Sequence, residues 1–235
     1  MSVQIITNTI GEAHERVVDF IRKRGEIIQT EDKEWTTEAI DVKIRVANPF
    51  DEPRISKYCF MGKRGFEEYA NNIVYGYSKH IGFIYDYHTR LFDWGGGSQD
   101  DGMVTYTGKT PQDTFYIKGK TDQVEYIIDK LKSDITSRRA LATTWIPPLD
   151  EKRKDVPCLQ LVQFLVRNNK LEMFVVFRSE DMLSGFGQNA YGLTMLQKYI
   201  AKELDISIGS YHHYVISGHI YHIRDSHELS MFPEV

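Results

Sequence analysis

The most reactive side chain in the sequence is the thiol of Cys158. A free thiol is mostly protonated at neutral pH, so it becomes a nucleophile where neighbouring cations lower its pKa. Two arginine groups could supply such cations, namely Arg138-Arg139 and Arg178, which is followed by Ser179. Guanidinium groups beside a hydroxyl also suit a phosphate monoester, because they provide bidentate donors and a fixed positive charge. The residue types therefore point to covalent chemistry on a phosphorylated substrate.

Each of these features has an ordinary structural alternative. A cysteine flanked by apolar residues is more often a buried small hydrophobic residue, and this interpretation is kept for Cys59, the other cysteine. Paired arginines are more often solvated surface charges. Two cysteines are too few for a disulfide framework, and their spacing is not that of metal ligands. The case for catalysis therefore depends on what surrounds Cys158.

The elements that would position Cys158 are predicted from apolar periodicity. Two apolar runs, 158–166 and 171–177, are separated by Asn168-Asn169, which is typical of a β-hairpin because asparagine tolerates positive φ. Helices are predicted over 10–24, 65–79, 122–132 and 190–204, further strands over 39–48, 139–145 and 211–222, and a loop over 95–113. Because strands and helices do not alternate as regular βαβ units, the sequence predicts an α+β fold.

Length and composition are those of a globular protein. The chain has 235 residues, of which 41% are hydrophobic and 26% charged, and we expect a single domain over 1–235. The net charge of −4 indicates no broad basic surface, so we expect no specific nucleic-acid partner. No apolar run approaches the ~18 residues of a membrane span, and the N-terminus does not resemble a signal peptide. We therefore expect a cytoplasmic protein with no membrane partner.

Five motifs then occur in a recognisable order. They are DQVEYIIDKLKSDITSRRALATTW, VPCLQ, FRSEDM, GFGQNAYGL and SGHIY, over about residues 122–222. In this order and spacing they resemble the thymidylate synthase family, and the PCLQ form is most similar to its short, archaeal-type branch. The resemblance implies a thymidylate-synthase-type fold, with a large mixed β-sheet and flanking helices. It also implies a homodimer in which two such sheets pack face to face.

The resemblance implies catalytic and phosphate-binding roles for five residues. Cys158 corresponds to the nucleophile that adds to C6 of the pyrimidine. This addition makes C5 a carbon nucleophile able to attack the iminium form of a methylene-pterin. Arg178 and Ser179 correspond to phosphate ligands, and Arg178 is expected near the thiolate. Arg138 and Arg139 correspond to a pair that reaches across the dimer interface to the partner protomer's phosphate.

Four further residues receive binding roles from the resemblance. Asp181 corresponds to the carboxylate that binds the pterin ring. Asn189 corresponds to the amide that contacts O4 and N3 of the pyrimidine, and an amide offers the donor and acceptor that uracil needs. His219 and Tyr221 correspond to the pair that holds the deoxyribose 3′-hydroxyl. Taken singly, Asp181 could equally be a helix cap and Asn189 a turn residue. His219 and Tyr221 could equally form one face of a strand packed on the core.

The N-terminal half carries weaker motifs. The run FEEYANNIVYG resembles the helix that carries the general-base glutamate of the family, for which Glu67 and Glu68 are both candidates. The run YDYHTR resembles the segment with an active-site tyrosine, which would be Tyr85. A glutamate pair on a helix is more often part of a solvated face, and this alternative stays open.

The implied reaction is the conversion of dUMP to dTMP by a methyltransferase. The co-substrate would be 5,10-methylenetetrahydrofolate or a methanopterin analogue, with no metal. The uracil nucleotide is favoured because relatives that act on dCMP typically carry an acid at the position of Asn189. The sequence departs from the family pattern at Leu159, where a histidine commonly follows the nucleophile, and at Phe177, where many members have glutamine.

The sequence leaves two other classes of function open. A more open site would admit water to the exocyclic methylene intermediate, so the first alternative is a dUMP, dCMP or CMP hydroxymethylase on the same fold. The second is a non-catalytic nucleotide- or metal-binding module. The histidines that suggest a metal are His212, His213, His219, His222 and His227. Strand alternation would separate His212 from His213, and a mere nucleotide binder would have no need of Cys158.

Overall fold

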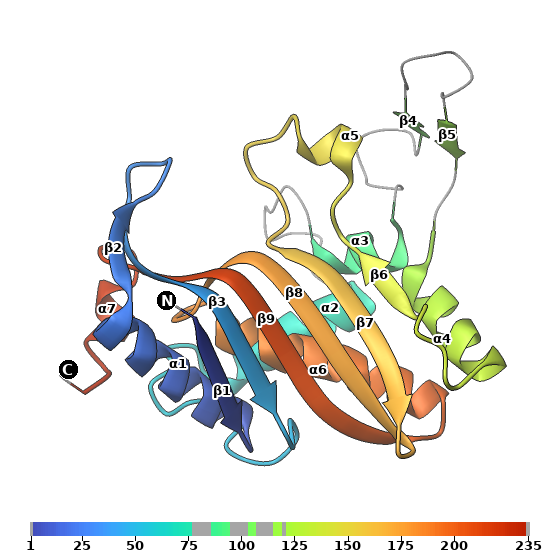
Figure 1. Ribbon diagram of the computed structural model, residues 1–235, viewed down its shortest axis with the longest axis horizontal. Coiled ribbons are helices and arrows are strands. Elements are labelled where there is room, and N and C mark those ends of the chain that lie inside the picture. The colour runs from blue at the N-terminus through green and yellow to red at the C-terminus, as the bar shows by residue number, and fades with distance from the viewer. Residues whose placement is uncertain (1, 77–85, 95–102, 107–114, 119–120, 234–235) are drawn as a thin grey trace.

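A seven-stranded mixed β-sheet forms the centre of the molecule in the computed structural model (Figure 1), which describes residues 2–76, 86–94, 103–106, 115–118 and 121–233. The strands are β1 Val3–Thr7, β2 Glu26–Gln29, β3 Trp35–Val46, β6 Leu141–Thr143, β7 Leu159–Arg167, β8 Lys170–Asp181 and β9 Ser207–Tyr221. Their order is β1-β3-β9-β8-β7-β6, and β2 pairs with β3. The β1–β3 and β8–β9 pairs are parallel and the others antiparallel. This arrangement is the predicted mixed sheet.

Helices flank this sheet (Figure 1). They are α1 Ile10–Arg24, α2 Lys63–Tyr75, α3 Tyr87–Phe92, α4 Gln123–Ser133, α5 Pro147–Asp150, α6 Phe186–Glu203 and α7 Ser226–Leu229, and a separate pair of strands comprises β4 Met103–Tyr106 and β5 Phe115–Lys118. The helix α6 packs on β8 and β9 and contacts α1 and α2. Gly192 brings α2 close, because a Cβ there would lie 2.6 Å from Cδ1 of Ile73. The α+β class is therefore confirmed.

Alternate residues along the central strands face different surroundings. In β8 the side chains of Met173, Val175 and Phe177 are fully buried, whereas Phe174 and Val176 between them are half-buried. On the neighbouring strands the exposed residues include Ile216 of β9 and Ile40 of β3, and the positive φ of Asp41 (60°) interrupts the alternation between Ile40 and the buried Val42. An antiparallel or mixed sheet with one face on its core shows this pattern. One face of the sheet thus packs on the helices, and the other leaves apolar side chains open.

Most long elements lie where the sequence predicts them. The helix over 10–24 begins and ends at the predicted residues, because its apolar positions form one buried face. Asn168 and Asn169 have φ of 51° and 58° and form the tight turn between β7 and β8. The helix predicted over 190–204 begins earlier, at Phe186. The predicted loop over 95–113 contains β4, so that expectation was wrong for this part.

A buried ion pair joins α3 to α5. The side chains of Arg90 and Asp150 are 5% and 0% exposed, and their two hydrogen bonds measure 2.7 and 3.0 Å. Asp150 also accepts the backbone N–H of Ile146 at 2.6 Å. No helix in the described ranges is long and apolar enough to cross a membrane.

Replacing Asp150 by alanine is expected to lower the free energy of unfolding by about 3–5 kcal/mol, because Arg90 is left buried and unpaired. Urea denaturation measures the change. Arg64→Ala is the matched control, because its partner Glu68 forms an exposed ion pair on the surface of α2. A midpoint for Asp150→Ala equal to that of the control would contradict the stabilising role of the buried pair.

Candidate active site

One end of the central sheet gathers residues from three strands. The strand β7 begins where β8 ends, with Leu159 opposite Phe177, and the Arg178 N–H donates to the Cys158 carbonyl at 2.9 Å. The parallel strands β8 and β9 end together, with Asp181 opposite His219. The sheet therefore brings the predicted nucleophile, phosphate ligand and pterin ligand to neighbouring strand ends.

The Cys158 thiol lies beside a guanidinium and a hydroxyl. Its Sγ is 3.7 Å from Nη2 of Arg178 and 3.8 Å from Oγ of Ser179. Arg178 is itself held in place, because Nε donates to the Pro157 carbonyl and Nη2 to the Val156 carbonyl, each at 3.0 Å. The backbone just before the nucleophile thus positions the cation that faces it.

Burial and charge act in opposite directions on this thiol. Burial raises the pKa of Cys158 above its ordinary value, and nearby Glu180 and Asp155 raise it further. The charge of Arg178 and the hydroxyl of Ser179 lower the pKa but do not offset the effect of burial. The resting thiol is consequently protonated at neutral pH, and Arg178 lies where it stabilises the thiolate once the proton leaves.

Asn189 lies in the first turn of α6 and is nearly buried. Its Nδ2 donates to Oε1 of Glu180 at 2.7 Å, and its Oδ1 accepts the Tyr69 hydroxyl at 2.5 Å. The other carboxylate oxygen of Glu180 is 2.5 Å from Nε2 of His213. The sequence did not single out Glu180 or Tyr69, and it suggested His213 only as a metal ligand. Glu180 carried one signal, as a charged residue between two predicted site residues in a buried strand, and Tyr69 carried another in the helical periodicity of its segment.

Asp181 closes the turn that leads into α6. Its Oδ1 accepts the backbone N–H groups of Leu183 and Ser184, each at 3.0 Å, so the alternative in which Asp181 caps the next segment describes part of its role. Burial raises the pKa of Asp181. Burial and the charge of Asp181 raise the pKa of Asp225 to about 6, and Asp225 accepts the Ser184 hydroxyl at 3.2 Å and the Tyr221 N–H at 2.7 Å. The two carboxyls therefore favour retaining a proton between them.

His219 and Tyr221 lie at the end of β9. Their rings are perpendicular, with centroids 4.8 Å apart, and the guanidinium of Arg224 lies 3.5 Å from the centroid of the Tyr221 ring. Burial lowers the pKa of His219, so its imidazole is neutral at pH 7. A neutral imidazole can both donate and accept a hydrogen bond, which suits a hydroxyl ligand.

Comparison with known proteins agrees with this geometry. A family model described as thymidylate synthase matches residues 55–229. A protein of Methanocaldococcus jannaschii named "Putative thymidylate synthase" is 40% identical over 96% of this chain and 94% of its own length. One of Methanosarcina barkeri with the same name is 33% identical over 91% and 87%. The "Bifunctional dihydrofolate reductase-thymidylate synthase" of Zea mays is 31% identical over 67% of this chain and 28% of its own length.

The chain belongs to the thymidylate synthase family. The predicted resemblance is thereby confirmed, and the relatives cover the N-terminal half as well as the motifs after residue 122. The family model includes Cys158 and every strand end described above. Membership supports the α+β assignment of the mixed sheet and its flanking helices.

The arginine pair of this thymidylate synthase family member lies away from Cys158. Arg138 and Arg139 are exposed, and the next residue, Ala140, accepts the N–H of Phe164 at 2.8 Å. Phe164 is six residues along β7 from Cys158, which corresponds to about 20 Å of extended strand. The structure does not bring this pair to the Cys158 cluster of the same chain.

The two predicted glutamates also lie apart from the cluster. Glu67 and Glu68 are exposed on α2 and pair with Lys63 at 3.8 Å and Arg64 at 2.8 Å. The solvated-face alternative therefore describes them in this structure, and the next residue, Tyr69, is the one that contacts Asn189.

The motif YDYHTR is only partly described. The predicted tyrosine, Tyr85, lies outside the described residues. The described Tyr87, two residues later, accepts the backbone N–H of Leu159 through its hydroxyl at 3.3 Å. A tyrosine of this motif thus lies directly beside the nucleophile.

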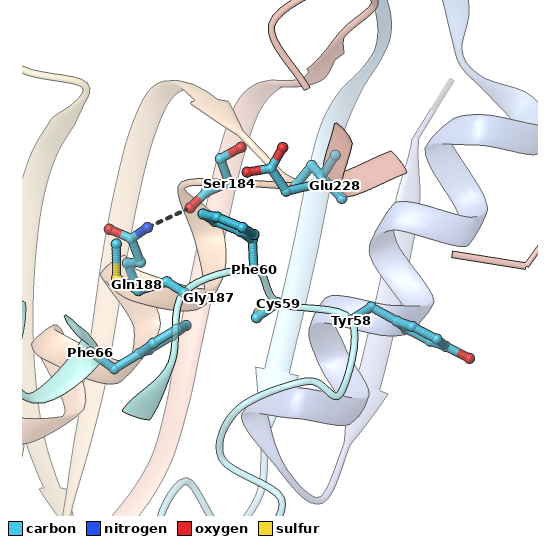
Figure 2. A pocket seen from close by; sticks show the side chains of 10 residues that line it. Tyr58, Cys59, Phe60, Phe66, Ser184, Gly187, Gln188 and Glu228 are labelled. Atoms are coloured by element: carbon cyan, nitrogen blue, oxygen red, sulfur yellow. Dashed lines mark hydrogen bonds between the residues drawn. The ribbon is translucent and has the colours of Figure 1, made fainter. Parts of the chain in front are cut away.

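A pocket opens beside Cys59, Ser184 and Glu228 (Figure 2). Its walls come from the segment before α2, the start of α6 and Glu228 of α7, and they include Tyr58, Cys59, Phe60, Phe66, Ser184 and Gln188. Burial raises the pKa of Cys59 to about 11, which leaves its thiol protonated. Cys59 is partly buried rather than fully buried as predicted; it packs against the cluster that contains Phe66, and its Sγ lies 3.6 Å from Nδ1 of His14.

The C-terminal histidines have protein partners on opposite sides of the sheet. His212 contacts Glu172 at 3.1 Å on the partly exposed face, whereas His213 contacts Glu180 in the core. Thr37 lies 2.9 Å from His222. Across the described ranges, no three histidine, cysteine, aspartate or glutamate side chains converge as metal ligands would.

Proposed function

We propose that this chain is a thymidylate synthase in activity as well as by family, converting dUMP to dTMP with a reduced pterin as the one-carbon donor. The observation that carries the proposal is the cluster at the start of β7, where the Cys158 thiol lies 3.7 Å from Arg178 and 3.8 Å from Ser179. A thiol, a fixed cation and a hydroxyl at one strand end suit a nucleophile placed beside a phosphate-binding site.

In the proposed reaction Cys158 loses its proton and Sγ bonds to C6 of the pyrimidine. Electron density moves to C5, which attacks the methylene carbon of the pterin. C5 then loses its proton and the bond between the methylene carbon and the pterin nitrogen breaks, which leaves an exocyclic methylene on the ring and a reduced pterin. A hydride from this pterin reduces the methylene to methyl, and the thiolate leaves C6. Arg178 and Ser179 hold the phosphate, while His219 and Tyr221 hold the 3′-hydroxyl. Asn189 contacts the O4 and N3 edge of uracil.

Asp181 is proposed to bind the pterin ring. Its carboxyl lies at the turn beside the nucleotide residues of β8, and the raised pKa values of Asp181 and Asp225 favour a proton that could be shared with a ring nitrogen. The donor is 5,10-methylenetetrahydrofolate or a methanopterin analogue. Both present a polar ring edge to such a carboxyl, and no metal is required for the transfer.

A product assay tests the reaction. Purified protein is incubated with dUMP and methylene-tetrahydrofolate, and product mass is followed together with dihydrofolate absorbance. We expect dTMP and dihydrofolate in equal amounts. Hydroxymethyl-dUMP without dihydrofolate would replace the proposal by the hydroxymethylase. Tritium release from C5 without product would point to a different pterin. The absence of both product and tritium release would contradict the proposal.

We further propose a homodimer formed through the open face of the sheet. This face carries apolar side chains that the chain itself leaves exposed, including Ile40 at 54% and Ile216 at 49%. Exposed apolar patches of this kind mark protein interfaces. Sheet-to-sheet packing would let Arg138 and Arg139, which lie about 20 Å of strand from their own Cys158, reach the partner's phosphate site.

Mixing two inactive variants tests this shared site. Protomers with Cys158→Ala and protomers with Arg139→Ala are each expected to be inactive as homodimers. A heterodimer contains one site that lacks both residues and one that retains both, so mixtures should regain up to about a quarter of wild-type activity by statistical assortment. Turnover after co-refolding of equal amounts measures this. Mixed dimers that stay inactive, although they form, would contradict an arginine pair acting in trans.

A further inference from the structure

A line of buried polar side chains lies behind Asn189. It links α2, α6, β8 and β9 in the order Tyr69, Asn189, Glu180, His213 and Tyr211. The successive contacts measure 2.5, 2.7, 2.5 and 2.7 Å. Glu180, His213 and Tyr211 are 3%, 1% and 0% exposed, so these contacts form away from water. Buried polar groups of this kind hold a single geometry when each has its partner.

The two neighbours of Asn189 determine which way its amide points. A carboxylate can only accept hydrogen bonds, so Glu180 requires the NH₂ group of Asn189 on its side. The Tyr69 hydroxyl donates to the amide oxygen on the other side. Turning the amide over would place its oxygen against the buried carboxylate and leave the Glu180 acceptor unsatisfied, which is costly in a buried site. One N–H and one oxygen lone pair of Asn189 remain for a ligand.

Glu180 is in turn fixed by its own partners. Its Oε2 lies 2.5 Å from Nε2 of His213. The His213 ring stacks on Phe177 with centroids 4.7 Å apart and meets Phe186 edge-on at 5.0 Å. The second ring nitrogen, Nδ1, lies 2.7 Å from the Tyr211 hydroxyl. The carboxylate therefore cannot rotate away from Asn189 without breaking a contact in the core.

We propose that Glu180 is a specificity-determining positioning residue that holds Asn189 in the orientation complementary to uracil and against cytosine. Uracil offers an acceptor at O4 and a donor at N3, which match the remaining N–H and oxygen of the fixed amide. Cytosine offers a donor at the exocyclic nitrogen and an acceptor at N3, so it requires the reverse amide, which Glu180 opposes. The inference rests on the proposed function, because Asn189 is assigned to the pyrimidine edge there.

The test is the binding of dUMP and dCMP to wild-type protein and to Glu180→Gln, measured by titration calorimetry without a pterin. Glutamine keeps the volume of Glu180 but offers both a donor and an acceptor, so either amide orientation can be satisfied. We expect the ratio of the dCMP to the dUMP dissociation constant to fall at least about tenfold, since a correct bidentate pairing typically discriminates by this order.

Glu172→Gln is the matched control. Glu172 lies on the same strand β8 and contacts His212 of β9, as Glu180 contacts His213, but the Glu172 pair faces the partly exposed side of the sheet. Its nucleotide ratio is expected to stay at the wild-type value. A second readout is a double-mutant cycle with Asn189→Ala, in which Glu180→Gln should no longer change the ratio, because the effect acts through Asn189.

Tyr69→Phe provides a test if Glu180→Gln does not fold, because it removes only the hydroxyl that holds the amide oxygen. We expect it to lower the ratio several-fold. If Glu180→Gln folds and keeps the wild-type ratio of dissociation constants, the inference is overturned while the proposed function stays intact. If Glu180→Gln does not fold, a wild-type ratio in Tyr69→Phe has the same consequence. A wild-type protein that binds neither nucleotide would overturn both, and one that prefers dCMP would overturn the orientation assigned to Asn189.

Discussion

Replacing Cys158 by alanine is expected to lower turnover by about 10⁴-fold or more, because removal of a covalent nucleophile leaves only binding and positioning. The affinity for dUMP should change by no more than a few-fold, since Arg178 and Ser179 keep their own contacts. Arg178 remains bound to the carbonyls of Pro157 and Val156 without the thiol. Steady-state assays with dUMP and pterin measure turnover, and titration calorimetry measures dUMP affinity.

Cys59→Ala is the matched control for this variant. Burial raises the pKa of Cys59 to about 11, and its side chain packs against Phe66, so loss of its thiol should leave turnover within about twofold of wild type. Equal turnover of Cys158→Ala and wild-type protein would reject covalent catalysis. Loss of dUMP binding together with turnover would instead show that Cys158 supports the structure of the nucleotide site.

Residues with a strong local pattern could be placed from the sequence alone. The helix α1 repeats Ala13, Val17 and Ile21 at four-residue spacing, and all three side chains are fully buried. The turn at Asn168-Asn169 needs positive φ, which asparagine tolerates. By contrast, β1 has only five residues and is held by its pairing with β3, so its own sequence carries little information.

Two features of the candidate site depend on contacts between distant residues. Asn189 was predicted just before a helix, but packing of Phe186 in the core extends α6 so that Asn189 lies in its first turn. The contact between Tyr69 and Asn189 joins residues 120 apart in the chain, which no local pattern encodes. The cluster of Cys158 and Arg178 was anticipated through the family motifs, because each motif contributes one strand end.

The periodicity of α2 predicts which of its residues faces α6. Phe66, Ala70 and Ile73 follow the spacing of a buried helical face, and the structure buries all three. Tyr69 borders this face, whereas Glu67 and Glu68 lie on the exposed side. Helical periodicity applied to this segment would have favoured Tyr69 over either glutamate as the residue that faces α6.

Replacing Arg178 by alanine is expected to lower kcat/KM by about a hundredfold or more, because one guanidinium is assigned two tasks. It binds the substrate phosphate, and its Nη2 lies 3.7 Å from the Cys158 Sγ. Its positive charge favours the thiolate, so its removal should raise the pKa of Cys158 further. Arg178→Lys keeps the positive charge but loses the paired donors of the guanidinium, so its kcat/KM should lie between those of wild type and Arg178→Ala.

Alkylation of the free enzyme separates the two tasks of Arg178. In a Cys59→Ala background only Cys158 can react with iodoacetamide, and the rate reports the fraction of thiolate. Because burial raises the thiol pKa, the rate should climb as pH rises above neutral, and Arg178→Ala should displace this climb to higher pH. If Arg178 served the phosphate alone, the alkylation profile would stay in place while KM for dUMP increased. A displaced profile would instead show that the cation prepares the nucleophile before any substrate arrives.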